Sequence, residues 1–413
     1  MNLLKKVRID RGVCAAKGFR AAGVPAAIKY EGRNDVALIV ADAPCAAAAV
    51  FTTNQVAAAP VLYDRQIVRG GRIQAILANS GCANACTGEA GLKDAELSAL
   101  ATAGELGIDP KLVLVASTGV IGRRLPMDRL LTGMKAAKGA LGRTAAHGLA
   151  AEQAVMTTDT KPKQAAVILT IDGKKVTIGG MSKGSGMIEP NMATMLGFIT
   201  TDAAISPRLL KRALQLAIGR SFNRLVVDGD ESTNDSVFLL ASGKAGNREI
   251  GGGGEKRWTK EFDLFTEGLT AVCTSLARQM AKDGEGATKF VTVHVKGAKT
   301  AKDAERAARA VAKSPLAKTS WFGRDPNCGR VLAAVGYSGA AVTDMKAEVF
   351  YDGEWAFRRG EIADEAQLER LAAVMKKDEF TVTVDLHLGK YEDVIYTCDF
   401  SLDYVHINAD YTT

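Results

Sequence analysis

Alternating apolar and polar positions mark the strands of this chain. Residues 163–180, KQAAVILTIDGKKVTIGG, alternate as far as Asp172-Gly173 and resume the alternation after it. An Asp-Gly pair at that point favours a type I′ turn, so a β-hairpin is predicted. Three further runs have the pattern of strands: 195–205, 290–295 and 380–388.

Helical periodicity follows two of these runs. Ser206-Pro207 supplies an N-cap residue and a first-turn proline, and residues 300–314 form a second helical pattern. Five apolar residues of the first helix share one face: Leu209, Leu210, Ala213, Leu214 and Ala217. Because helices, strands and hairpins are interspersed, a mixed α+β layered fold is expected. A chain of 413 residues exceeds what one simple core usually accommodates, so two domains or two intertwined lobes are expected.

Composition and charge limit the classes of partner. The chain is 47% hydrophobic and 24% charged, as in an ordinary globular protein. Its net charge of +7 comes from 53 basic residues spread among 46 acidic ones without a long basic run, so nucleic acid is not expected as a partner. A small anionic substrate would fit this charge.

No stretch of the sequence predicts secretion, membrane insertion or a metal site. The start, MNLLKKVRIDRG, lacks the apolar core of a secretion signal. The longest uncharged stretch, 43–63, contains two prolines and is a poor membrane span. Cys82 and Cys86 are spaced CxxxC and no histidine cluster joins them, so reduced thiols in a cytoplasmic protein are expected.

Several familiar motifs are missing. GGMSKGSG (179–186) differs from a phosphate-binding loop because its lysine precedes the last glycines. DGDESTND (228–235) looks like a calcium loop, but Thr233 and Leu239 stand where that loop needs glycine and glutamate, so a capped turn is predicted. His294 and His387 lie in polar phases of strands and are predicted at the surface. An acyl-transfer enzyme with this sequence would have to activate its nucleophile without a histidine triad.

Thr194 stands where a glycine-rich loop meets an apolar run, in MSKGSGMIEPNMATMLGFITT (181–201). Threonine is a weak nucleophile at neutral pH unless a base lies beside it. Cleavage of the Ala193-Thr194 bond would give Thr194 a free α-amine with a pKa of about 8, compared with about 10.4 for lysine. That amine could act as the base for the hydroxyl of the same residue. The alternative is an ordinary threonine at the start of a strand.

The cleavage itself could be autocatalytic. The Thr194 hydroxyl can attack the Ala193 carbonyl and shift the acyl group from nitrogen to oxygen before water releases it. A planar amide resists this attack, so the local backbone must be strained. Gly184, Gly186 and Pro190 are the residues expected to shape that conformation.

The stretch around Thr194 resembles the processing site of the ornithine acetyltransferase family, also called the bifunctional glutamate N-acetyltransferase/amino-acid acetyltransferase family. Further segments resemble family segments in the expected order, and together they cover essentially the whole chain. They are 18–29 (GFRAAGVPAAIK), 47–61, 79–88 (NSGCANACTG), 116–127 (ASTGVIGRRLPM), 221–235, 282–290, 318–339 and 407–413 (INADYTT).

The resemblance implies an αββα sandwich similar to that of N-terminal nucleophile hydrolases but connected differently. It also implies self-cleavage after Ala193 into an α chain of 1–193 and a β chain of 194–413. The two chains would intertwine in one unit, and two such units would form an α2β2 heterotetramer.

Site residues also follow from the resemblance. Thr194 matches the nucleophile, and Thr118 and Gly119 match the oxyanion-hole pair. The positions that match substrate contacts are Thr157, Lys183, Thr194, Glu285, Asn408 and Thr413. Lys183 would supply a positive charge to a substrate carboxylate, and Glu285 would bind an amine or help to move its proton. Without the resemblance, Lys183 and Glu285 would be interpreted as solvated loop residues.

The implied reaction is a ping-pong acetyl transfer from N2-acetyl-L-ornithine to L-glutamate through acetyl-Thr194, in arginine biosynthesis. Some family members also accept acetyl-CoA, which is therefore a further candidate substrate. No metal and no bound organic cofactor is implied.

Two other hypotheses stay open. A self-processing amide hydrolase or aminopeptidase of related architecture would share the nucleophile but release the acyl group to water. A non-enzymatic binding protein would keep Thr194 as a structural residue of an intact chain.

Overall fold

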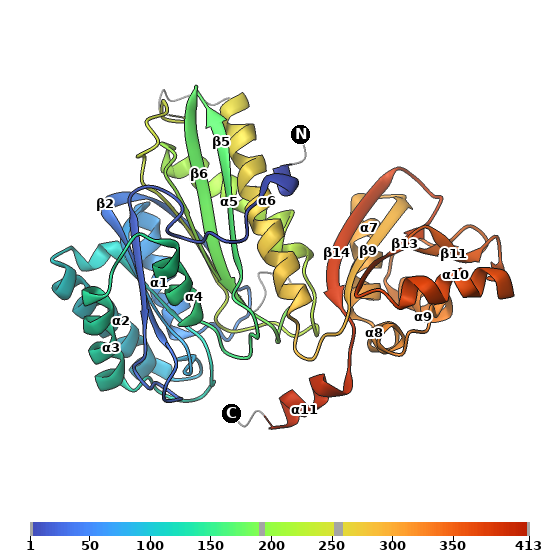
Figure 1. Ribbon diagram of the computed structural model, residues 1–413, viewed down its shortest axis with the longest axis horizontal. Helices are drawn as coiled ribbons and strands as arrows, with labels where there is room; N and C mark the ends of the chain where they lie inside the picture. Colours follow the sequence, from blue (N-terminus) through green and yellow to red (C-terminus); the bar gives the residue numbers. More distant parts are fainter. Residues whose placement is uncertain (1–2, 190–194, 252–258, 411–413) are drawn as a thin grey trace.

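The structure is a computed structural model that describes residues 3–189, 195–251 and 259–410. It has two lobes, each with its own sheet and hydrophobic core (Figure 1). The sheet of the first lobe has the order β4-β3-β2-β8-β7-β6-β5, with β1 paired to β2. Its strands are β1 (Phe19–Val24), β2 (Val36–Phe51), β3 (Arg72–Asn79), β4 (Val113–Ser117), β5 (Gln164–Ile171), β6 (Lys174–Lys183), β7 (Leu196–Thr201) and β8 (Ser236–Ala241).

The long strand β2 belongs to both halves of this sheet. Residues 36–40 pair with β1 and β3, residues 46–51 pair with β8, and the register shifts after Val40. A single core contains Ile39 from one half together with Phe198 from the other. The two halves of the sheet therefore pack face to face.

Helices cover the outer faces of both halves. Leu38 of β2 shares a core with α2 and α3, whereas Leu239 of β8 shares a core with α5 and α6. The layers follow the order helix, sheet, sheet, helix, which confirms the expected mixed α+β class and αββα sandwich. The helices of this lobe are α1 (Ala59–Ile67), α2 (Gly88–Leu106), α3 (Met127–Gly139), α4 (Ala145–Gln153), α5 (Pro207–Gly219) and α6 (Lys260–Lys282).

The second lobe contains a six-stranded sheet in the order β12-β11-β10-β13-β9-β14. Its strands are β9 (Phe290–Ala298), β10 (Glu348–Tyr351), β11 (Glu354–Arg358), β12 (Glu361–Ile362), β13 (Glu379–Asp385) and β14 (Tyr391–Cys398). Its helices are α7 (Ala301–Lys313), α8 (Pro315–Phe322), α9 (Cys328–Tyr337) and α10 (Glu365–Met375). The last helix, α11 (Leu402–Asp410), leads from this lobe back towards the first (Figure 1). Short 3-10 helices are η1 (Leu3–Lys6), η2 (Val68–Gly70), η3 (Pro110–Leu112) and η4 (Phe222–Arg224).

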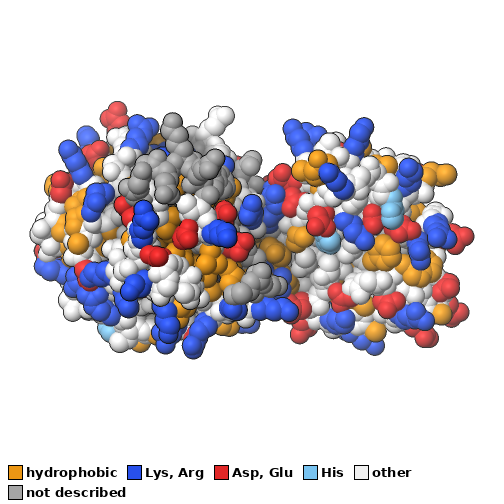
Figure 2. Space-filling view, turned by 90° about the horizontal axis from the view of Figure 1, so that it is seen from above, with side chains coloured by type: hydrophobic (Ala, Val, Ile, Leu, Met, Phe, Trp, Pro, Cys, Tyr) orange, Lys and Arg blue, Asp and Glu red, His pale blue; other side chains and the backbone are white. Residues whose placement is uncertain are grey.

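The surface carries charges of both signs. Figure 2 shows Lys and Arg side chains interspersed with Asp and Glu over one face of the two lobes. Within the described ranges, no helix is long and apolar enough to cross a membrane.

Local sequence patterns predicted many of these elements correctly. Asp172 and Gly173 join β5 to β6 with φ values of 50° and 69°, the left-handed values that a type I′ turn needs. The strands predicted at 195–205, 290–295 and 380–388 correspond to β7, β9 and β13, and the helix at 300–314 corresponds to α7. The five apolar residues assigned to one face of α5 are all buried, but the Ser206 side chain makes no capping hydrogen bond.

Candidate active site

A cavity of about 250 Å³ lies in the first lobe. Six residues that the family resemblance singled out border it: Thr118, Gly119, Thr157, Lys183, Glu285 and Asn408. The other three, Ala193, Thr194 and Thr413, lie outside the described residues. The fold thus gathers residues from widely separated chain segments around one space.

Thr118 and Gly119 directly follow β4. The Thr118 N–H donates to the Asn79 carbonyl oxygen at 3.0 Å, which fixes the turn at the end of the strand. Gly119 has a φ of 130°, and a Cβ at this position would lie 2.4 Å from the carbonyl carbon of Gly81, so only glycine fits. In residues 3–189, 195–251 and 259–410, the Gly119 amide has no hydrogen-bond acceptor. The Thr118 hydroxyl and the Gly119 amide can therefore both donate to an oxygen in the cavity.

Lys183 is the last residue of β6 and is 4% exposed. Its Nζ donates to the Thr118 hydroxyl oxygen at 3.1 Å. Burial lowers the pKa of Lys183, whereas the nearby Asp159 raises it. The interpretation of Lys183 as a solvated loop lysine is wrong, because the end of β6 runs into the interior of the sandwich.

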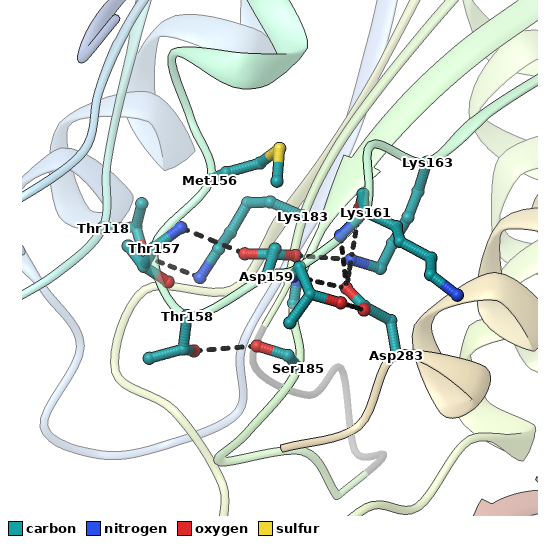
Figure 3. A network of polar contacts seen from close by, with 12 residues as sticks. Thr118, Met156, Thr157, Thr158, Asp159, Lys161, Lys163, Lys183, Ser185 and Asp283 are labelled. Carbon is teal, nitrogen blue, oxygen red and sulfur yellow. Dashed lines mark hydrogen bonds and ion pairs between the residues drawn. The ribbon is translucent and has the colours of Figure 1, made fainter. Parts of the chain in front are cut away.

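A buried network lies behind Lys183 (Figure 3). Lys163 Nζ donates to Asp159 at 2.7 Å and to Asp283 at 2.5 Å. Asp283 also accepts from the Thr160 N–H at 3.0 Å. The side chains of Lys163, Asp159 and Asp283 are at most 4% exposed, so the ion pairs are largely shielded from water.

Glu285 and Asn408 also border the cavity. The Asn408 side-chain amide donates to Glu285 Oε2 at 2.9 Å, which connects α11 to the loop after α6. The Glu285 N–H donates to the Ser185 carbonyl oxygen at 2.8 Å. A Cβ at Gly186 would lie 2.2 Å from the Glu285 carboxylate, so a larger residue at 186 would displace this carboxylate.

Comparison with known proteins places the chain in a family. The profile of the ArgJ family matches residues 20–413. The arginine biosynthesis bifunctional protein ArgJ of Symbiobacterium thermophilum is 51% identical over 97% of this chain and 98% of its own length. This chain belongs to the ArgJ family.

Other relatives carry related names. The glutamate N-acetyltransferase of Methanocaldococcus jannaschii is 44% identical, over 98% of this chain and 99% of its own length. A crystal structure is known of the ornithine acetyltransferase of Mycobacterium tuberculosis with ornithine. The matched chain of that structure shares 45% sequence identity with this chain, and the match covers 45% of this chain and 97% of the other, with a TM-score of 0.42. The match to the ArgJ profile and the two relatives identical at 51% and 44% confirm the family that the sequence motifs resembled.

The acidic loop 228–235 takes part in this site, which sequence reasoning missed. Asn234 Nδ2 donates to the carbonyl oxygens of Ala83 at 2.6 Å and Ser117 at 2.9 Å. Asp235 Oδ1 accepts from the Met195 N–H at 2.8 Å. The loop therefore braces both the segment before Thr118 and the residue that follows Thr194. The dense run of Asp, Asn and hydroxyl residues was the available signal.

Asp228 supports the other side of the same region. Its carboxylate accepts from the backbone N–H groups of Met187 at 2.5 Å and Ile188 at 2.8 Å. It also accepts from the Asp230 N–H at 3.2 Å, as in the capped turn that the sequence predicted. Asp228 thus combines a local turn with long-range support of residues 187–188.

A second cavity of about 260 Å³ adjoins the first. Thr157 and Thr158 line both cavities, and Lys29 and Arg33 bring positive charge to the second. A Cβ at Gly81 would lie 2.8 Å from the Lys29 Cβ, so Lys29 packs directly against the strand end that supports Gly119.

In the described part of the chain, no group of three or more His, Cys, Asp and Glu side chains could hold a metal ion. His294 and His387 lie in the second lobe and contact Glu392 and Glu348.

Proposed function

We propose that this protein transfers the acetyl group of N2-acetyl-L-ornithine to L-glutamate in arginine biosynthesis. The proposal rests on the cavity bordered by Thr118, Gly119 and Lys183 in a chain of the ArgJ family. Thr194 is the proposed nucleophile, freed by cleavage after Ala193 into chains 1–193 and 194–413. The antiparallel pairing of β6 with β7, from either side of that bond, would hold both chains in one sheet.

In the first half-reaction, the Thr194 hydroxyl attacks the acetyl carbonyl while the α-amine of Thr194 accepts its proton. Thr118 and Gly119 would donate to the oxyanion, and a single such donor contributes about 3 kcal/mol. The carbon–nitrogen bond then breaks, the proton passes to the leaving amine, and ornithine departs from acetyl-Thr194. Lys183 would bind the substrate α-carboxylate, and Glu285 would bind the side-chain amine of ornithine.

In the second half-reaction, the amine of glutamate attacks the acetyl-Thr194 ester. The oxyanion forms at the same donors, the Thr194 oxygen recovers a proton, and N-acetylglutamate leaves. Thr157, Asn408 and Thr413 are proposed to complete the substrate contacts. No metal ion and no resident cofactor takes part in this scheme.

Acetyl-CoA is proposed as a second acetyl donor. The adjoining cavity provides space beyond what an acetylated amino acid needs, and its Lys29 and Arg33 suit phosphate groups. The double variant K29M/R33M tests this proposal. Its acetyl transfer from acetyl-CoA should fall by about tenfold or more beyond any change in transfer from N2-acetylornithine. An equal change in both reactions would contradict the assignment.

The proposed assembly and location complete the scheme. The α and β chains would form an α2β2 heterotetramer in the cytoplasm, with small molecules as the other partners. Mass photometry of the purified protein, with size-exclusion chromatography as a second measurement, tests the assembly.

Intact mass spectrometry of wild type and T194A tests the central claim. Wild type should give two chains that begin at Met1 and Thr194, whereas T194A should remain whole and lose acetyl transfer. A cleaved T194A protein would exclude self-processing by this hydroxyl. An intact, fully active wild type would exclude the α-amine as the base.

The product distinguishes the proposed transferase from an amide hydrolase of related architecture. With N2-acetylornithine and glutamate together, N-acetylglutamate should dominate over free acetate. Acetate as the main product, with or without glutamate, would favour the hydrolase. An intact chain without either product would favour a binding protein.

A further inference from the structure

The network behind the cavity includes the ammonium groups of Lys163 and Lys183 and the carboxylates of Asp159 and Asp283 (Figure 3). Lys163 forms ion pairs with both carboxylates, those of Asp159 and Asp283. Lys183 forms none: across the described residues, no carboxylate oxygen lies within 4.0 Å of its ammonium group. The two lysines are therefore buried in the same network but held in different ways.

Asp159 is the group that connects this network to the cavity wall. Its Oδ1 accepts from Lys163 Nζ and from the Gly184 N–H, both at 2.7 Å. Its Oδ2 accepts from the Thr157 N–H at 3.0 Å. Gly184 directly follows Lys183, and Thr157 borders the cavity. One buried carboxylate thus fixes the backbone on two sides of the proposed substrate.

The contacts of Asp159 leave the Lys183 ammonium available. An ammonium group has three N–H donors, and in the described ranges Lys183 uses one of them, on Thr118. A direct ion pair with Asp159 would occupy a donor and compete with a substrate carboxylate. Instead, Asp159 directs its oxygens to Lys163 and to two backbone N–H groups, and acts on Lys183 at a distance.

We propose that Asp159 is a positioning residue for acetyl transfer, which aims the Lys183 ammonium at Thr118 and supplies its counter-charge without bonding to it. This inference rests on the proposed function, in which Lys183 receives the substrate carboxylate. Asp283 differs from Asp159 because it bonds Lys163 and the backbone around Thr160 but contacts neither Lys183 nor the cavity wall.

The charges around Lys183 define how its protonation should respond to substitution. Burial lowers the pKa of Lys183, and Lys163 lowers it further. Asp159, Glu285 and Asp235 raise it. Although burial alone would raise the pKa of Asp159, the neighbouring Lys163 and Lys183 lower it to about 2. Asp159 therefore stays negative over the working range of pH.

Matched variants D159N and D283N test the proposal through the pH profile of kcat/KM for N2-acetylornithine. Each variant removes one of the two carboxylates that pair with Lys163. If the network only stabilised the fold, both variants should therefore have similar pH profiles. In D159N, the loss of a nearby negative charge should lower the pKa of Lys183, and activity should be lost at a pH lower by about one unit or more. In D283N, this alkaline limb should stay at the wild-type position. The main kinetic loss in D159N should be a higher KM.

A third variant, K163M, removes a positive neighbour of Lys183 and should move the alkaline limb to higher pH. This variant keeps the test decisive if D159N does not fold. An alkaline limb at the wild-type pH in K163M would overturn the proposal. Equal shifts in D159N and D283N would also overturn it. Wild type without acetyl transfer would refute the proposed function itself, whereas an active wild type with the wrong pattern among variants would refute only the role of Asp159.

Discussion

Each lobe of the molecule buries lysines, and Lys183 and Lys318 differ in what surrounds them. Lys318, in α8 of the second lobe, donates to the Thr397 hydroxyl oxygen at 2.9 Å and to the Cys398 carbonyl oxygen, and it lies 4.5 Å from the ring centroid of Phe400. Lys183, in the first lobe, donates to Thr118 and borders the cavity. Burial lowers the pKa of both side chains. Burial alone therefore does not distinguish the two lysines, whereas the cavity beside Lys183 does.

The lobes also differ in the buried polar atoms that lack hydrogen-bond partners. In the described part of the first lobe, these atoms include carboxylate oxygens of Asp64, Glu152 and Asp235. In the described part of the second lobe, they are the neutral side-chain atoms of Trp321 and Tyr351. Each buried carboxylate oxygen without a partner costs stability. The lobe that contains the cavity tolerates this cost, and Asp235 is bonded to the residue that follows the proposed nucleophile.

The variant K183M should have the largest effect on activity. Loss of a buried charge that stabilises substrate or transition state typically lowers turnover by about 10²–10³-fold, and acetyl transfer should fall by that factor. The free energy of unfolding should change by less than about 1 kcal/mol, because no bonded carboxylate is left unpaired. Steady-state kinetics and urea unfolding measure the two effects, with cleavage checked by intact mass.

Wild-type kcat/KM in K183M would contradict a role of Lys183 in the reaction. A large loss of stability together with activity would mean that Lys183 acts as Lys318 does, as part of the core.

The variant K318M should show the opposite pattern. Its substitution leaves the Thr397 hydroxyl and the Cys398 carbonyl without the Lys318 donor, and each buried acceptor that loses a partner costs about 1–3 kcal/mol. The free energy of unfolding should fall by about 2–4 kcal/mol, while kcat/KM per folded molecule stays within about twofold of wild type. Denaturant unfolding and active-site-normalised kinetics measure these outcomes. An unchanged free energy of unfolding would show that the hydrogen bonds of Lys318 make no net contribution to stability.

Local patterns were sufficient for the hairpins and amphipathic helices. The turn at Asp172-Gly173 and the buried face of α5 depend on neighbours in sequence, so periodicity and turn chemistry predicted them. The bend of β2 could not be predicted in this way. It depends on the pairing of residues 46–51 with β8, which follows almost two hundred residues later. The face-to-face packing came from the family resemblance, since no local pattern indicates it.

Local sequence patterns were also insufficient to predict the candidate active site. The family motifs identified Thr118, Gly119 and Lys183, whereas residue patterns alone favoured a solvated Lys183. Asp159 and Asn234 were missed because their roles depend on burial and on partners distant in sequence. The sequence predicted a capped turn at 228–235, and this turn describes only the local bonds of Asp228.

The third prediction concerns the pH dependence of stability and leaves activity at a fixed pH unchanged. Burial raises the pKa of Glu152 from 4.5 to about 8. Between these values the folded state keeps a proton that the unfolded state releases, so the stability of wild type should fall as pH rises, with a slope of at most about 1.4 kcal/mol per pH unit. In E152Q this contribution is absent, and the stability of the variant relative to wild type should therefore grow from pH 5 to pH 8. The exposed Glu361 of the second lobe provides the matched control, E361Q, which should retain the wild-type slope in urea unfolding. Identical slopes in all three proteins would mean that the first lobe holds Glu152 charged, and the contrast between the two lobes would then be limited to their lysines.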